Sequence, residues 1–80
     1  MNDLYCTTIN VEGKERGVLV SIKPDRDRGY RGEYLIPIGP GKGNLTLYAY
    51  ADLPGVLPKA QELWDYNRRI LPRLMLISFD

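Results

Sequence analysis

Residues 45–51 read LTLYAYA, and residues 58–71 read PKAQELWDYNRRIL. In the first stretch every second residue is Leu or Ala, which is the period of a strand with one buried face. In the second stretch apolar residues recur every three or four positions, which is typical of a helix with one apolar stripe. Pro58 suits the first turn of this helix, and Pro72 ends it. A strand followed by a helix predicts a sheet with a helix packed on it.

Three further runs with the period of a strand precede this stretch: Leu4–Val11, Arg16–Lys23 and Glu33–Ile38. Most of the connections between the runs contain Gly and polar residues, so we expect neighbouring strands to alternate in direction. Pro24 is expected to end the second strand, and residues 25–32 are expected to form a loop. Pro37 lies inside the third run and indicates an edge position or a bulge.

The last run, Arg73–Phe79, has apolar residues in both of its alternating sets. A helical crossover would return this run parallel to the fourth strand, and therefore antiparallel to the first strand, beside which it can pair. We predict an α+β fold with a five-stranded, mainly antiparallel sheet, the order β-β-β-β-α-β along the chain, and one helix packed on one face. In the sheet the strands would follow the order 5-1-2-3-4. Residues 1–80 are expected to form one compact domain.

The periodic positions also predict the hydrophobic core. Residues that fall on the inner face of a strand or in the stripe of the helix are expected to be mostly buried: Val18, Val20, Ile36, Leu47, Ala49, Leu63, Trp64, Ile70, Leu74, Leu76 and Phe79. Cys6, the only cysteine, is expected to be a small core residue in the first strand.

Composition narrows the classes of function. Eleven Lys and Arg against ten Asp and Glu give a formal net charge of +1, which excludes a broad basic surface for nucleic acid. The lone cysteine excludes a disulfide framework, and the N-terminal residues do not have the pattern of a signal peptide. The longest apolar runs, about five residues, are far too short to span a membrane. We expect a location in the cytoplasm of a bacterium or of the host of a virus.

Catalytic chemistry is not expected. The chain has no histidine, so it lacks the commonest general base and the commonest imidazole ligand of zinc. Asp25 and Asp27 stand next to Arg26 and Arg28, which neutralise them as cation ligands. The sequence GPGKG at residues 39–43 lacks the following Ser or Thr and helix of a phosphate-binding loop, so it predicts a plain hairpin turn. We expect no enzymatic activity, no metal site and no cofactor.

Arginine and tyrosine dominate the candidate binding residues. Residues 25–34 read DRDRGYRGEY, and the chain has six tyrosines but one phenylalanine, which favours aromatic rings that reach water. Tyr48 and Tyr50 are two residues apart on one strand, so both project from the same side of the sheet. The candidate surface comprises Arg26, Arg28, Tyr30, Arg31, Tyr34, Lys42, Tyr48 and Tyr50. Two other interpretations stay open: a solvated loop whose Asp and Arg residues satisfy each other, and a second small core beneath the loop.

Two functions fit such a surface. The first is a non-enzymatic interaction module that binds a protein partner, because Arg and Tyr dominate binding hot spots. Whether the module is a monomer or a homodimer stays open. The second is a nucleotide or single-stranded nucleic-acid binding module, in which tyrosines stack on bases and arginines contact phosphates. In its size, its self-contained fold and its lack of catalytic residues, the chain is similar to small phage-encoded accessory proteins that block host defence systems, anti-CRISPR proteins among them. That resemblance implies an inhibitor of a host protein.

Overall fold

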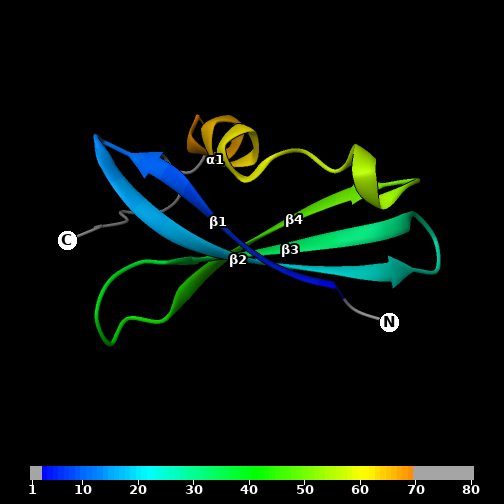
Figure 1. Ribbon diagram of the computed structural model, residues 1–80, viewed down its shortest axis with the longest axis horizontal. Coiled ribbons are helices and arrows are strands. Elements are labelled where there is room, and N and C mark those ends of the chain that lie inside the picture. The colour runs from blue at the N-terminus through cyan, green and yellow to red at the C-terminus, as the bar shows by residue number, and fades with distance from the viewer. Residues whose placement is uncertain (1–2, 70–80) are drawn as a thin grey trace.

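The computed structural model describes residues 3–69 of the chain. This part is an antiparallel four-stranded sheet in which β1 (Asp3–Val11), β2 (Lys14–Asp25), β3 (Gly29–Pro37) and β4 (Asn44–Ala51) lie side by side in chain order. A 3-10 turn, η1 (Pro54–Val56), and an α-helix, α1 (Ala60–Arg68), follow the last of these strands. Figure 1 shows η1 and α1 on the same side of the sheet. The described residues therefore form a small α+β fold with an antiparallel sheet.

The turn between β1 and β2 explains why the first two strands form a tight hairpin. Glu12 and Gly13 both have positive φ, at 52° and 82°, as a two-residue turn that matches the twist of the strands requires. The side-chain oxygen Oδ1 of Asn10 accepts a hydrogen bond from the Gly13 N–H at 3.0 Å, which fixes the turn further. The register that follows sets Val11 opposite Lys14 and Tyr5 opposite Val20.

Strands β2 and β3 extend further than the sequence predicts. Pro24 does not end β2 but pairs with Tyr30 of β3, and the expected loop 25–32 is largely strand. By the alternation of antiparallel pairing, the nitrogen of Pro24 points away from β3, toward the side of β1. On that side the described pairing of β1 with β2 starts at Asp3 and Ile22, so within residues 3–69 the missing N–H of Pro24 interrupts no pair of the ladder.

The end of β3 follows the same rule. Pro37 lies in a strand with neighbours on both sides, but it pairs only with Asn44 of β4, because the pairing of β3 with β2 stops at Leu35. The prediction of an edge position for Pro37 therefore holds only at the last residue of β3, where β2 provides no partner.

Two other predictions reach beyond the described residues. The fifth strand, Arg73–Phe79, lies outside them, as do the predicted core residues Ile70, Leu74, Leu76 and Phe79, and the four strands observed do not confirm a count of five. The helix begins at Ala60, two residues after the predicted start at Pro58, with Lys59 in extended geometry before it. Within residues 3–69, α1 is not long or apolar enough to cross a membrane, and neither is any other helix.

The core lies between the sheet and α1. All predicted core residues that fall within the described part are buried: Val18, Val20, Ile36, Leu47, Ala49, Leu63 and Trp64. Four buried residues complete the cluster beyond the prediction: Ile9, Val11, Tyr34 and Ala60. Burial of each large apolar side chain contributes on the order of 1.5–3 kcal/mol. This layer therefore fixes which face of the sheet α1 covers.

The side chain of Gln61 joins α1 to the outer edge of β1. Its Oε1 accepts a hydrogen bond from the Asn10 N–H at 2.6 Å, and its Nε2 donates to the Asn10 carbonyl at 3.2 Å. These are the two bonds that a neighbouring strand would make with one residue of β1. Because the pairing alternates, Leu4, Cys6 and Thr8 point their backbone N–H and C=O groups to the same edge.

Candidate functional site

The strand register places Tyr48 and Tyr50 on the face of the sheet opposite α1, which we call the outer face. Leu47 and Ala49 alternate with them and are buried in the core. Tyr48 lies opposite Glu33 and Tyr50 opposite Arg31, so these four side chains share a face. Tyr48 is 50% exposed and Tyr50 is 41% exposed. The outward orientation predicted from their spacing is correct.

Two arginines stack on these two tyrosines. The guanidinium carbon Cζ of Arg28 lies 4.2 Å from the centroid of the Tyr50 ring. The Cζ of Arg31 lies 5.8 Å from the centroid of the Tyr48 ring. Both distances fall within the range in which a cation is attracted to the face of an aromatic ring. We call Arg28, Arg31, Tyr48 and Tyr50 the Arg–Tyr row.

The turn between β2 and β3 holds Arg28 in place. Oδ1 of Asp25 accepts hydrogen bonds from the N–H groups of Asp27 and Arg28, both at 3.0 Å. Gly29 follows with a φ of 81°, and a Cβ at this position would lie 2.8 Å from the Ala51 carbonyl oxygen. Only glycine tolerates that combination of dihedral angle and contact. The turn therefore passes close to the end of β4, where Tyr50 lies.

Glu33 fixes the position of Arg31 from the side. Its Oε2 lies 2.8 Å from Lys23 Nζ and 3.5 Å from Arg31 Nη2, and the Glu33 side chain is 18% exposed. The hydrogen bond from Lys23 holds the pKa of Glu33 below its ordinary value; partial desolvation opposes this effect, and the charges of Lys23 and Arg31 reinforce it. One carboxylate shared by two cations leaves one positive charge uncompensated in this cluster.

Two of the predicted site tyrosines lie on the opposite face. Tyr34 pairs with Leu47, points into the core and is 4% exposed, and its hydroxyl donates a hydrogen bond to the Pro58 carbonyl at 2.5 Å. Burial raises the pKa of Tyr34 above its ordinary value. Tyr30 pairs with Ala51 and shares this face, where it is half-buried. The structure therefore does not bring Tyr30 and Tyr34 together with Tyr48 and Tyr50.

The remaining two predicted residues lie at opposite ends of the sheet. Arg26 is exposed at the turn between β2 and β3, next to the Arg–Tyr row. Lys42 is exposed in the turn between β3 and β4, at the other end (Figure 1). That turn is closed by hydrogen bonds from Lys42 N–H to the Gly39 carbonyl at 3.1 Å and from Ile38 N–H to the Gly43 carbonyl at 3.3 Å. The predicted hairpin turn at residues 39–43 is confirmed.

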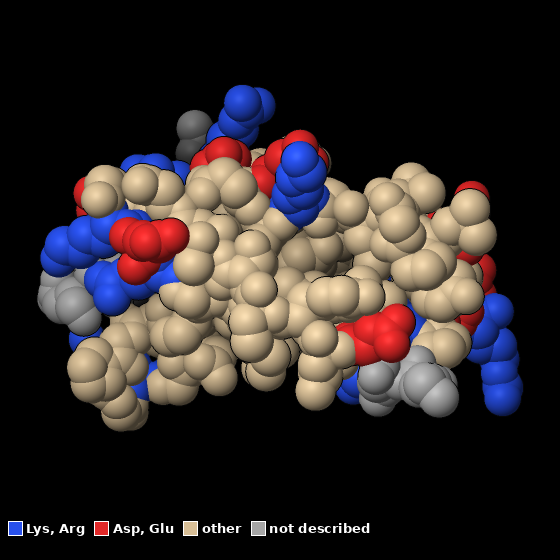
Figure 2. All heavy atoms as spheres, viewed as in Figure 1, with Lys and Arg blue, Asp and Glu red and all other residues tan. Residues whose placement is uncertain are grey.

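Next to the Arg–Tyr row, the outer face carries an apolar patch that the sequence did not predict. Its residues are Leu4, Cys6, Leu19 and Leu35. Leu4 is 66% exposed and Leu19 is 41% exposed. The expectation that Cys6 is a core residue is wrong: its side chain is exposed, because Cys6 alternates with Tyr5 and Thr7 and projects from the face opposite α1. Figure 2, in the view of Figure 1 with α1 at the top, shows charged side chains gathered mainly toward the two ends of the molecule and along its helix side.

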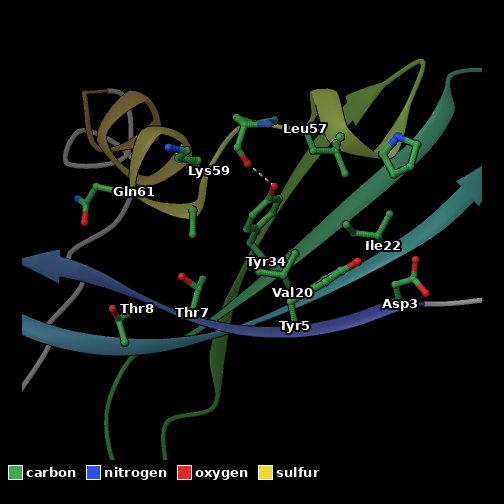
Figure 3. Close-up of a pocket in the computed structure, with 14 residues that line it drawn as sticks. Asp3, Tyr5, Thr7, Thr8, Val20, Ile22, Tyr34, Leu57, Lys59 and Gln61 are labelled. Carbon is green, nitrogen blue, oxygen red and sulfur yellow. Dashed lines mark hydrogen bonds between the residues drawn. The ribbon is translucent and has the colours of Figure 1, made fainter.

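The helix-covered side has a groove between β1 and the segment that connects η1 to α1. Its volume is about 590 Å³, and it is open to solvent along β1. Tyr5, Ile22 and Leu57 line it, together with the ring of Tyr34, whose hydroxyl points to the connecting segment (Figure 3). The groove therefore presents mainly apolar contact surface. Within residues 3–69, no three His, Cys, Asp or Glu side chains lie close enough together to hold a metal ion.

Comparison with known proteins does not assign the chain to a family. No family model, no curated protein and no solved structure matches it. The geometry of the outer face is therefore the basis for a function.

Proposed function

We propose that the protein is a non-enzymatic interaction module that binds a protein partner through the Arg–Tyr row. The observation that carries the proposal is the pair of stacked contacts on the outer face, Arg28 on Tyr50 and Arg31 on Tyr48. Arg and Tyr offer broad planar contact surface, and they are enriched among the residues that dominate binding energy. Among the described residues, no helix covers this face (Figure 1).

The local charge favours a protein partner over a nucleic acid. Glu33 lies between Lys23 and Arg31, and Asp25 and Asp27 stand beside Arg26 and Arg28 in the chain. A surface that binds phosphates needs an excess of uncompensated cations, because their release of counterions supplies most of the affinity. Here acidic residues accompany almost every cation.

The second candidate is a module that binds nucleotides or single-stranded nucleic acid, because Tyr48 and Tyr50 present exposed rings on which bases can stack. Arg28 already occupies one face of the Tyr50 ring, however, so a base would have to displace the guanidinium or stack on it. This competition makes the nucleic-acid function the weaker candidate.

The experiment starts with capture of a partner from a bacterial lysate and continues with the purified pair. Arg28→Ala and Tyr50→Ala are each expected to weaken binding by about 2 kcal/mol, which is roughly 30-fold, since both residues belong to the centre of the contact. Tyr66→Ala serves as the matched control, because Tyr66 is an exposed tyrosine on α1 and is 65% exposed. Calorimetric titration measures the affinities, and circular dichroism checks that each variant is folded.

Several results would contradict the proposal. If the partner binds Arg28→Ala and Tyr50→Ala as tightly as the wild type, the Arg–Tyr row is not the site. If the captured partner is RNA or DNA, and its affinity falls steeply as salt increases, the second candidate is correct. Turnover of a nucleotide, peptide or ester that one acidic-residue variant abolishes would contradict the non-enzymatic assignment.

The proposal extends to the biological class of the protein. The lone cysteine and the balanced charge of this chain agree with a cytoplasmic accessory protein of the kind that phages encode to block a host defence system. The partner would then be a component of that system, and its binding would be the inhibitory event.

We also propose that the sheet has a fifth strand, Arg73–Phe79, paired with the outer edge of β1. Supporting this, Leu4, Cys6 and Thr8 direct their backbone groups to that edge, and Gln61 occupies the same edge only at Asn10. Arg68 Nη2 lies 3.6 Å from Glu12 Oε1 at the β1–β2 turn, so α1 ends near this turn. A chain that continues from that end of α1 can run back antiparallel to β1. Seven extended residues span roughly 23 Å, which is enough to cover the stretch from Thr8 to Leu4.

A further inference from the structure

Three residues of the apolar patch form a line across the strands of the outer face, and Leu19 is the middle one. Cys6, Leu19 and Leu35 are directly opposite one another on three adjacent strands, and Thr46 continues the line on β4. Leu4 adjoins this line on β1. Contiguous exposed apolar side chains on a small protein usually mark an interface. The line therefore runs across the strands through the middle of the outer face.

Charged residues flank the line on both sides, at equal distances. On β2, Lys23 follows Leu19 by four residues and Glu15 precedes it by four, so both lie on the outer face. Each is about 13 Å from Leu19 along an extended strand. The cluster around Lys23 keeps one positive charge, because Glu33 balances only one of Lys23 and Arg31. On β2, the outer face therefore carries opposite charges on the two sides of the line.

This pattern fits a second copy of the chain in one orientation. If two outer faces meet with their strands antiparallel, the line of one molecule packs on the same line of the other molecule. Each Lys23 cluster then faces the Glu15 of the other copy. If the strands run parallel, Lys23 faces Lys23, and like charges placed opposite each other are unfavourable. A Cβ added at Gly17 would meet nothing within 4 Å, so the face is open there to receive side chains from the facing sheet.

We propose that the protein forms a homodimer in which the two outer faces pack against each other along the line Cys6–Leu19–Leu35, with antiparallel strands. Stacked sheets lie about 10 Å apart and cross at about 30°. Because of this crossing, Arg28 and Tyr50, near the ends of their strands, lie at the rim of the contact. Arg31 belongs to the Lys23 cluster and Tyr48 lies two residues from Thr46, so both lie inside the contact, and in the dimer the Arg–Tyr row is open to a partner mainly at Arg28 and Tyr50. Variants at Leu19 and Glu15 test the homodimer, whereas variants at Arg28 and Tyr50 test the function proposed above, so failure of one can be told from failure of the other.

The first test is the mass of the protein in solution, measured by sedimentation over a range of concentrations. The wild type is expected to sediment with twice the monomer mass of 9.1 kDa. In Leu19→Glu two carboxylates face each other at the centre of the contact. The dissociation constant of the dimer should therefore rise at least about 100-fold. Leu53→Glu is the matched control, because Leu53 is 62% exposed and lies outside the sheet, so its dimer should be unchanged.

The second test uses Cys6, the only cysteine in the chain, as a position-specific probe. Two Cys6 residues facing each other across sheets about 10 Å apart are too distant for a disulfide but within reach of a short bis-maleimide crosslinker. Wild-type protein should yield crosslinked dimer, and Leu19→Glu should yield little.

The third test examines the orientation. Glu15→Lys should weaken the dimer at least about tenfold by placing cations opposite Lys23, and adding Lys23→Glu should restore it. A protein that stays monomeric at every concentration, a dimer that Leu19→Glu leaves intact, or a dimer that does not crosslink through Cys6 would overturn the proposal. Failure of the charge exchange to restore the dimer would overturn the antiparallel arrangement. Circular dichroism of each variant separates loss of the dimer from loss of the fold.

Discussion

At the scale of the residue, Tyr34 joins the sheet to the segment that precedes α1. Its buried hydroxyl donates to the Pro58 carbonyl. We expect Tyr34→Phe to lower the free energy of unfolding by about 0.5–1.5 kcal/mol, the usual net contribution of such a hydrogen bond. Urea unfolding at pH 7 measures the difference. Tyr66→Phe, at an exposed position on α1, should leave the stability unchanged.

The same residue predicts a dependence on alkaline pH. Burial raises the pKa of Tyr34, so the unfolded chain loses this proton at a lower pH than the folded chain does. The stabilisation is therefore complete below the ordinary tyrosine pKa, about 10, and is lost as the pH rises through the folded value. The free energy of unfolding of Tyr34→Phe should therefore fall less than that of the wild type as the pH rises above about 10. Equal pH profiles for the two proteins would show that the hydroxyl is not buried.

At the scale of the element, the position of α1 on β1 depends on the Gln61 amide. Gln61→Glu keeps the shape of the side chain but removes the donor to the Asn10 carbonyl. It also places a second carboxylate beside Asp65, which in the wild type accepts a hydrogen bond from Gln61 Nε2 at 3.1 Å. We expect a loss of about 1 kcal/mol at pH 7. Near pH 3 the protonated carboxyl can donate again, so the difference from wild type at the same pH should shrink.

Glu62→Gln provides the control for this element, because Glu62 is exposed on the same helix and no bond of the described residues to β1 involves it. A Gln61→Glu protein as stable as the wild type at pH 7 would mean that the amide contacts do not hold α1 in solution.

At the scale of the whole molecule, hydrogen exchange tests the proposed fifth strand. The amides of Tyr5, Thr7 and Ile9 face β2 and should exchange slowly whether or not β1 has another neighbour. Those of Leu4, Cys6 and Thr8 point to the outer edge and should exchange slowly only if Arg73–Phe79 pairs there. Residue-resolved exchange rates from NMR make the comparison within one strand. Rapid exchange at Leu4, Cys6 and Thr8 beside slow exchange at their neighbours would contradict the five-stranded sheet.

The sequence predicted those features that depend on local periodicity. The alternation in residues 45–51 gave the correct faces of Tyr48 and Tyr50, and the spacing in residues 60–68 gave the helix with Trp64 buried. It did not predict the strand at residues 29–32, because Gly and Arg have little preference for a strand and this one forms by pairing with Tyr50 and Ala51 far along the chain.

Long-range packing also decided the faces of Tyr34 and Cys6, which the sequence misplaced. The polar tip of Tyr34 favoured a position in water, but it shares a face with Ile36, and α1 covers that face. Cys6 shares a face with Leu4 and Thr8, and periodicity within one strand does not tell which of its two faces a distant helix will cover.

The turn that holds Arg28 has a consequence for the thermodynamics of association. Asp25 and Gly29 fix the backbone around Arg28, and the Tyr50 ring supports its guanidinium, so much of the conformational entropy of this side chain is lost on folding. Immobilising a long side chain at an interface costs about 0.5–1.5 kcal/mol. A partner that docks on a preordered arginine avoids most of that cost, and 1.4 kcal/mol corresponds to about a tenfold difference in affinity. If the protein binds its partner through the Arg–Tyr row as proposed, the turn contributes to the affinity without touching the partner.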